Sequence, residues 1–302
     1  MTTKTNKTYD QITAQIVEAM DRGVIPWAMP WKYVNPANGK TQKAYRGTNR
    51  LFLGMTAMVE KYQSPYFFTE KQAGGMGGTI KADQRGKFHV VRFFAFRFKW
   101  VTDEITGEKK KKTYPYYREW LVYNVDQINF PKHISQALTL AGDDRDKITD
   151  AEQIVAGIPF DLAINHGIYN KAATHIQTGQ IDMPLAGSFK DRNSYYRTLF
   201  HEMVHATAKD LKRKTGAKFG DQEYAREELV AEMGAAFLAA EAHIDPAIAN
   251  HAAYIKSWQD AITKDAGLVA YAAREAQKAA DYIMGRYVPR HMRKKDKDVK
   301  TA

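Results

Sequence analysis

The string HEMVH at residues 201–205 restricts the possible structure of this chain more than any other feature. Two histidines four residues apart lie on one face of an α-helix, roughly 5 to 6 Å apart at Cβ, which suits two adjacent corners of a tetrahedral metal site. Glu202 is turned away from them around the helix, so its carboxylate can reach a water molecule beside the metal without being a ligand. The string therefore predicts a metal-binding helix with His201 and His205 as ligands and Glu202 as general base.

A third protein ligand is expected from the string EELVAE at residues 227–232. A polar, glycine-containing segment separates the two strings, so a second helix can return alongside the first. Glu228 and Glu232 are four residues apart and share a helix face. We assign the metal to Glu228 and a hydrogen bond from a ligating histidine to Glu232, with Glu227 as the less favoured ligand. Two histidines and one carboxylate leave a position open for water, as in a catalytic zinc site, although such donors also accept manganese.

This arrangement is typical of metal-assisted hydrolysis, in which the general base passes a proton from water to the leaving amine. Peptide hydrolysis is the expected reaction. An oxyanion donor is also needed, and we favour Tyr254 over Tyr224, His243 and His251. The segment 179–189 is expected to form a hairpin with an edge strand that can pair with an extended peptide. The alternative interpretation is that both histidines are ordinary core or surface residues and the glutamates are their solvated partners.

The composition narrows the class of protein. The chain has 302 residues and no cysteine, which excludes disulfides, thiolate metal sites and cysteine nucleophiles. Its hydrophobic fraction of 44% and charged fraction of 26% are typical of a globular protein. No segment approaches eighteen consecutive apolar residues, and the N-terminus lacks the apolar stretch of a secretion signal. We expect a cytoplasmic protein with no membrane partner.

The excess positive charge lies in the N-terminal half. Residues 1–142 hold 22 Lys and Arg against 11 Asp and Glu, whereas the remainder holds 23 of each. A polar segment at 142–153 marks the change from a basic, aromatic sequence to an alanine-rich helical one. We expect an α+β protein with a β-containing domain at 1–146, a mainly helical domain at 147–288, and a basic, disordered tail at 289–302.

The basic half also holds four of the five tryptophans. This combination suits single-stranded DNA, because bases stack on aromatic rings while Lys and Arg meet the phosphates. The alternative is that the rings form a core and the cations an ordinary surface. The residues expected to contact DNA are Trp27, Trp31, Tyr45, Arg46, Asn49, Arg97 and Lys99.

Two local elements are expected in this half. The runs at 89–101 and 114–125 are rich in aromatic and β-branched residues and predict a β-hairpin. Its turn is expected to contain the lysines at 109–112, whose charge would attract DNA. A helix is expected to begin near Asn49, with N-terminal amides that would suit a phosphate.

Longer strings throughout the chain are specific in combination, and they are IPWAMPW, NPANGKTQKAYRGTN, FFTEKQAGGMGGTIK, WLVYNVDQI, IDMP, YYRTLFHEMVHATA, EELVAEMGAAFLAA and HAAYIKSW. With these strings the chain resembles the ArdC-type antirestriction proteins of plasmids and related mobile elements. The resemblance implies an N-terminal domain that binds single-stranded DNA and a zincin-like metallopeptidase domain of the gluzincin type. It implies protection of entering plasmid DNA from host restriction, with the host restriction machinery as one candidate protein substrate. It also places the metal on His201, His205 and the glutamate of EELVAE, and catalysis on Glu202.

Two other functions are compatible with these residues. The chain could be a non-enzymatic protein that coats single-stranded DNA and uses its metal only for stability. It could also be a metal-dependent nuclease, although one site of this type lacks the paired carboxylates usual for two-metal phosphoryl chemistry.

Overall fold

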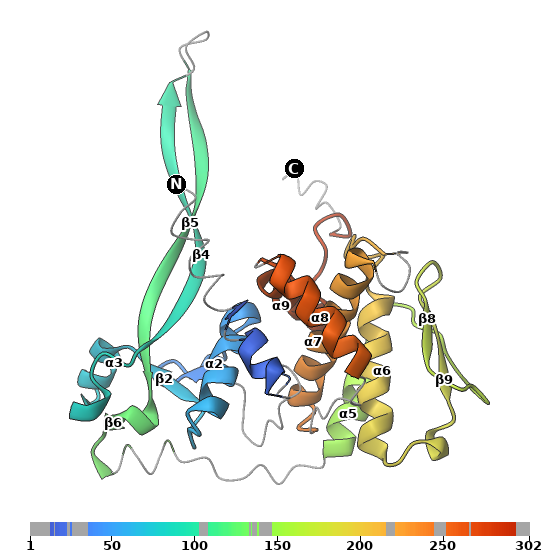
Figure 1. The fold of residues 1–302 in the computed structure, drawn as a ribbon. Coiled ribbons are helices and arrows are strands. Elements are labelled where there is room, and N and C mark those ends of the chain that lie inside the picture. Colours follow the sequence, from blue (N-terminus) through green and yellow to red (C-terminus); the bar gives the residue numbers. More distant parts are fainter. Residues whose placement is uncertain are drawn as a thin grey trace, which may run out of the picture. The chain divides into compact units, whose positions relative to one another are not determined.

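The structure, a computed structural model, divides the chain into two compact units (Figure 1). Unit 1 comprises Met1–Val34, Arg46–Leu51 and Gly142–Ala302, and unit 2 comprises Asn35–Tyr45 and Phe52–Ala141. The expected domain boundary at 146 stays a prediction. The described residues are 13–14, 16–22, 25, 36–102, 108–132, 134, 138, 147–215, 221–244, 252–265 and 267–293.

Unit 2 is built around strands. Its four-stranded sheet has the order β1-β2-β5-β4, in which β1 and β2 are parallel and the other pairs antiparallel. A two-stranded sheet joins β3 and β6. The strands are β1 (Ala37–Asn38), β2 (Tyr66–Phe68), β3 (Thr79–Ile80), β4 (His89–Thr102), β5 (Lys109–Asn124) and β6 (Ile128–Asn129). The helices are α3 (Glu70–Gly74), the 3-10 turns Ala82–Gln84 and Val125–Gln127, and the larger part of α2 (Gly47–Val59), whose residues 47–51 belong to unit 1.

The hairpin of β4 and β5 confirms the prediction from aromatic and β-branched alternation, but its turn was predicted wrongly. Lys109–Lys112 belong to β5 and pair with Lys99–Thr102 of β4. A lysine is tolerated in an exposed strand because its aliphatic stem lies on the sheet while the ammonium group stays in water. Strand pairing can therefore continue through the four lysines.

Unit 1 combines a small sheet with helices. The sheet has the order β7-β9-β8, with β7 parallel and β8 antiparallel to β9. The segment expected to supply an edge strand, 179–189, instead contains the central strand, and β8 lies at the edge. The elements are α5 (Lys147–Ala156), β7 (Ile164–Gly167), β8 (Ala173–His175), β9 (Gln180–Pro184), the 3-10 turn Ala186–Ser188, α6 (Arg192–Ala206), α7 (Gln222–Glu241), α8 (Ala252–Lys264) and α9 (Leu268–Ile283).

Helix α7 is the centre of unit 1. It packs against α6, α8 and α9, and most of its residues from Leu229 to Ala239 are buried. The small residues in AAFLAA allow the neighbouring helices to approach closely. Strands in the N-terminal half and mainly helices in the C-terminal half confirm the expected α+β class. Within the described part of the chain, no helix combines the length and apolarity needed to span a bilayer.

Candidate metal centre

Helix α6 carries the three residues of the HEMVH string that were assigned functions. Its N-terminus is capped by Asp191, whose side chain accepts a hydrogen bond from the amide of Ser194 at 2.6 Å. His201, Glu202 and His205 follow in its last two turns, where Glu202 and His205 are buried. The helix thus delivers both imidazoles on one face, as their spacing predicts.

Helix α7 brings a glutamate to this face because a glycine allows close approach. A Cβ atom at Gly234 would lie only 2.7 Å from Cγ2 of Val204 on α6, which is too short for a real contact. Any larger residue at 234 would push the two helices apart at the level of the histidines. The close packing places Glu228 opposite His201 and His205.

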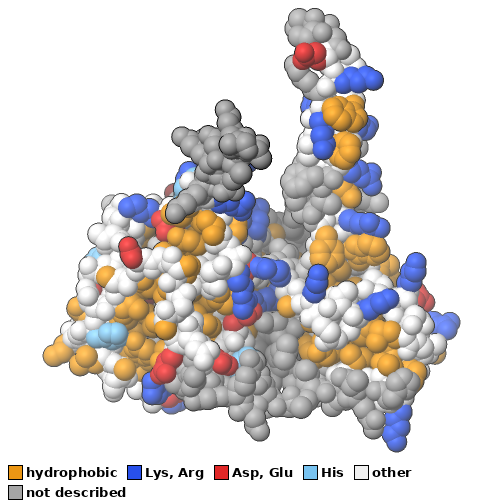
Figure 2. All heavy atoms as spheres, turned by 180° about the vertical axis from the view of Figure 1, so that it is seen from behind, with side chains coloured by type: hydrophobic (Ala, Val, Ile, Leu, Met, Phe, Trp, Pro, Cys, Tyr) orange, Lys and Arg blue, Asp and Glu red, His pale blue; other side chains and the backbone are white. Residues whose placement is uncertain are grey.

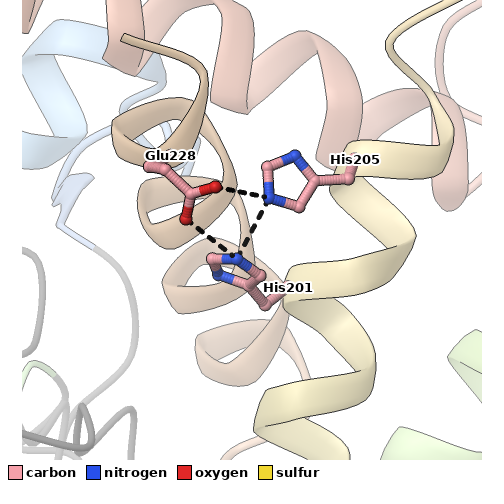
Figure 3. Close-up of side chains that lie close together, drawn as sticks. All are labelled: His201, His205 and Glu228. Carbon is pink, nitrogen blue, oxygen red and sulfur yellow. Dashed lines mark hydrogen bonds and ion pairs between the residues drawn. The ribbon is translucent and has the colours of Figure 1, made fainter. Parts of the chain in front are cut away.

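Three donor groups converge (Figure 3). The Nε2 atoms of His201 and His205 are 3.1 Å apart, and the carboxylate of Glu228 lies 3.6 Å from the first and 3.5 Å from the second. Two tetrahedral ligands, each about 2.1 Å from a zinc ion, are about 3.4 Å apart. The spacing and the two-nitrogen, one-carboxylate donor set therefore fit a single divalent cation.

The other nitrogen of each imidazole faces a different carboxylate. Nδ1 of His201 lies 3.3 Å from Oε1 of Glu232, and Nδ1 of His205 lies 3.2 Å from Oε1 of Glu227. An ionised carboxylate only accepts hydrogen bonds, so each Nδ1 is the donor in its contact, and this orients each Nε2 towards the position that a metal would take. Glu232 lies where its predicted role requires, and Glu227 makes the equivalent contact to the second histidine.

Arg213 holds Glu227 in place. Its guanidinium donates to both carboxylate oxygens of Glu227 at 2.9 Å, and to Thr207 Oγ1 at 2.9 Å and Val204 O at 2.7 Å. The side chain is only 1% exposed. Because Thr207 and Val204 belong to the C-terminal end of α6 and Glu227 to α7, this one cation joins the two helices beside the donor cluster.

The cluster is strongly electrostatic. Burial would lower the pKa of His201, but the carboxylates of Glu232 and Glu228 overcome this effect and hold it well above the usual 6.5. Burial would raise the pKa of Glu228, yet the two histidines hold it below its ordinary value. Glu227 also has a lowered pKa, because hydrogen bonds from His205 and Arg213 outweigh its burial. Several carboxylates around two imidazoles provide the negative charge that a divalent cation would neutralise.

Glu202 lies at the wall of a cavity of about 340 Å³ that is open to solvent. Its Oε2 atom is 2.6 Å from the hydroxyl of Thr174 on β8, which can donate to it. Tyr224 also lines the cavity, and its side chain hydrogen-bonds Glu228. The other residues that line the cavity are Lys171, Ala172, Ala173, Ile176, His201, His205, Thr215, Glu223, Glu227 and Glu228.

Three residues of this site were missed by reasoning from the sequence. Thr174 and Arg213 carry no motif, and Glu227 was considered only as an alternative metal ligand. Of the expected oxyanion donors, Tyr224 reaches the cavity, while His243 pairs with Asp150 at 3.1 Å instead. His251 and the side chain of Tyr254 lie outside the described part of the structure.

Comparison with known proteins decides the family. A family model described as the N-terminal domain of anti-restriction factor ArdC matches residues 6–125, and a zincin-like metallopeptidase model matches 149–275. The crystal structure of metal-free antirestriction ArdC from plasmid R388 is 31% identical, with a TM-score of 0.72, and the match covers 92% of this chain and 97% of that one. The chain belongs to the ArdC family of antirestriction proteins.

Other relatives of this ArdC family member are similar over most of its length. The Mn(II)-bound structure of R388 ArdC is 29% identical to this chain, with a TM-score of 0.70. The match covers 92% of this chain and 97% of the R388 chain. Protein y4eC of Sinorhizobium fredii is 29% identical over 91% of both chains. Two Escherichia coli proteins named DNA primase TraC are 29% and 27% identical over 91% of this chain. The chain spans only 27% and 20% of those two proteins.

The residues expected to contact DNA differ in their exposure to solvent in this ArdC family member. Tyr45 is 6% exposed and packs with Leu53, Phe67, Val91 and Val122. It is therefore a core residue, and not a surface residue that contacts DNA as we expected. Its phenol is apolar enough to fill this core, and burial raises its pKa. Arg97 and Lys99 are exposed on β4, and their contact with DNA stays a prediction. Trp27 and Trp31 lie outside the described residues.

The expected phosphate site at the start of α2 is occupied by internal contacts. Arg46 forms an ion pair with Asp281 of α9, and the amide of Gly47 donates to Gln277 Oε1 at 3.1 Å. Asn49 is partly buried and also has a partner within the protein. These contacts join the first turn of α2 to α9 within unit 1, so Arg46 and the first amide of the helix, near which a phosphate was expected, have partners within the protein.

Proposed function

We propose that this protein is a divalent-metal-dependent peptidase of the antirestriction type that also binds single-stranded DNA and acts in the cytoplasm. The observation that carries the proposal is the convergence of His201, His205 and Glu228, with Glu202 beside them in an open cavity. The Mn(II)-bound form of R388 ArdC, a relative of nearly the same length, supports a divalent metal. Protection of incoming plasmid DNA is the role that the family implies.

His201, His205 and Glu228 would hold the metal, with zinc as the first candidate and manganese as the second. A bound divalent metal lowers the pKa of water and polarises a peptide carbonyl. Glu227 and Glu232 would orient the two imidazoles through their Nδ1 atoms.

The remaining residues of the cavity suit peptide hydrolysis. Glu202 accepts the proton of the attacking water and passes it to the leaving amine, while Thr174 holds its carboxylate in position. We propose Tyr224, whose side chain lies in the cavity, as the hydrogen-bond donor to the developing oxyanion, and Tyr254 stays a prediction. Strand β8, at the edge of its sheet, offers backbone groups to an extended peptide.

Metal binding tests the proposal directly. The purified protein is expected to contain about one divalent ion per chain, and metal at one hundred times its dissociation constant should stabilise the fold by about 2.7 kcal/mol. His201→Ala should lose both effects because it removes a ligand. Elemental analysis and thermal unfolding with and without chelator measure them.

His243→Ala is the matched control, because His243 pairs with Asp150 away from the donor cluster. It should keep the metal content of the wild type. Equal metal content in wild type and His201→Ala would contradict the proposed site.

Binding of single-stranded DNA is supported by the excess of Lys and Arg in residues 1–142 and by exposed rings on β4 and β5. Affinity for a fluorescent dT20 oligonucleotide is expected to fall steeply with salt, by about 0.7 in log–log slope for each phosphate contacted. The same length of duplex should bind more weakly, because its bases are not free to stack. Fluorescence anisotropy at several salt concentrations measures both, and equal affinity for duplex would count against stacking.

A further inference from the structure

The β4–β5 hairpin projects as a two-stranded ribbon from the rest of unit 2 (Figure 1). Strand β2 pairs with β5 only at Tyr123 and Asn124, the last two residues of that strand. Among the described strands, the hairpin beyond this point has no other sheet neighbour. An isolated two-stranded ribbon is only marginally stable in water, so a ribbon of this length with exposed rings calls for a functional explanation.

The register assigns each side chain to one of two faces. Residues directly opposite each other share a face, and successive residues alternate between faces. Phe93 lies opposite Arg118, Arg97 opposite Tyr114, and Lys99 opposite Lys112, and these positions differ by an even number of residues along each strand, so they share one face. We name this side the basic face, and its members are Phe93, Arg97, Lys99, Lys112, Tyr114, Tyr116, Arg118 and Trp120.

Cations and rings lie next to one another along the basic face. Arg118 lies over the ring of Trp120 at 4.2 Å, Arg97 over Tyr116 at 4.3 Å, and Lys112 over Tyr114 at 5.7 Å. Trp120 and Tyr114 remain 39% and 40% exposed. No described residue of this face is acidic, although Glu108 lies at the far end of the hairpin. Figure 2 shows hydrophobic and basic side chains along the hairpin.

The opposite face differs in charge and pattern. Its described side chains include Glu119, paired with Arg92 at 2.7 Å, and among them one ring–cation contact is found, between Lys111 and Phe98. Phe98 and Trp100 on this face are 57% and 63% exposed. Exposed rings therefore occur on both faces, but repeated ring–cation pairs without an acidic neighbour occur on the basic face.

We propose that single-stranded DNA binds along the basic face of the hairpin, an assignment that rests on the proposed DNA binding. An open ribbon has no walls to enclose a base, but it presents rings and cations in one line. Bases of an extended strand stack on Trp120, Tyr116 and Tyr114, while the guanidinium and ammonium groups beside those rings meet the phosphates. An acidic peptide would neutralise the cations and leave the rings without stacking partners. In a duplex the base faces are already covered, which favours single strands.

The test compares two pairs of rings in the full-length protein. The double variant Tyr114→Ala with Trp120→Ala removes two rings from the basic face. The double variant Phe98→Ala with Trp100→Ala removes two rings from the opposite face, where they are more exposed to solvent. The first pair should weaken binding to dT20 at least about tenfold, because each stacked base contributes substantially, and the second should change it less than about twofold. Thermal unfolding checks that each variant is folded.

Removal of charge provides a second measurement that does not depend on the rings. Lys112→Gln, at an exposed position near the far end of the hairpin, should reduce the salt slope by about 0.7. If wild type does not bind dT20, the proposed DNA binding fails and this surface fails with it. If wild type binds dT20 but the two ring-pair variants bind it with equal affinity, and Lys112→Gln keeps the salt slope, DNA does not bind along the basic face. The proposal that the protein binds DNA would still stand. In that case the ring–cation pairs serve only to cover the hairpin's own rings.

Discussion

Glu202→Gln is expected to lower peptide hydrolysis by about 10²- to 10⁴-fold while leaving metal affinity unchanged. The amide keeps the shape of the side chain and its contact with Thr174, but it cannot accept the proton of the attacking water. Hydrolysis of fluorescein-labelled casein by the metal-loaded protein measures the chemical effect. Transfer of a plasmid into a restricting recipient measures the biological one, and protection should fall together with hydrolysis.

Glu223→Gln is the matched control, since Glu223 lines the same cavity and its side chain is 52% exposed. It should retain hydrolysis and protection. If Glu202→Gln protects plasmid DNA as well as the wild type does, proteolysis has no part in protection. The protein would then act as the non-enzymatic DNA-coating protein considered above. Loss of metal in Glu202→Gln would instead mean that Glu202 supports the metal itself.

Arg213→Met is expected to destabilise the protein by about 3–5 kcal/mol, because it leaves the carboxylate of Glu227 buried without its cation. It also removes the donors to Val204 and Thr207 at the end of α6. Metal affinity should fall as well, by about 10- to 100-fold, since Glu227 orients His205. Denaturant unfolding of the metal-free protein and metal titration measure the two effects separately.

Two further variants separate charge from packing. Adding Glu227→Gln to Arg213→Met removes the uncompensated charge, so the double variant should recover part of the lost stability. Arg192→Met removes a more exposed arginine that pairs with Glu152 at 2.7 Å, and should cost no more than about 1 kcal/mol. If Arg213→Met costs no more than Arg192→Met, Arg213 does not hold the two helices together.

The roles expected for Glu228 and Glu232 agree with their positions because helical periodicity acts over short distances. Residues four apart on one helix share a face in any fold, so the two histidines and the two glutamates could each be paired from spacing alone. The contribution of Glu227 was harder to foresee. It lies on a different part of the α7 surface, and only the packing of α7 against α6 turns it towards Nδ1 of His205.

The errors in the N-terminal half have the same origin. Tyr45, Arg46 and the start of α2 have the composition of a nucleic-acid contact, but their burial and ion pairs are made by residues distant in the sequence. The hairpin was recognised from local alternation, whereas the face on which each ring lies depends on the pairing register. A shift of one residue in the pairing of the two strands would move the side chains of one strand to the other face and change every cross-strand neighbour.

By itself, the sequence determined the α+β class, the family, and the helix that presents His201, Glu202 and His205, because these depend on local periodicity and on strings of adjacent residues. Only the tertiary structure decided that Thr174 contacts Glu202, that Arg213 supports Glu227, and that β8 rather than β9 is the edge strand. Each of these facts depends on segments distant in the sequence being packed together. Their side chains meet through close helix packing and strand order, which no spacing along the chain specifies.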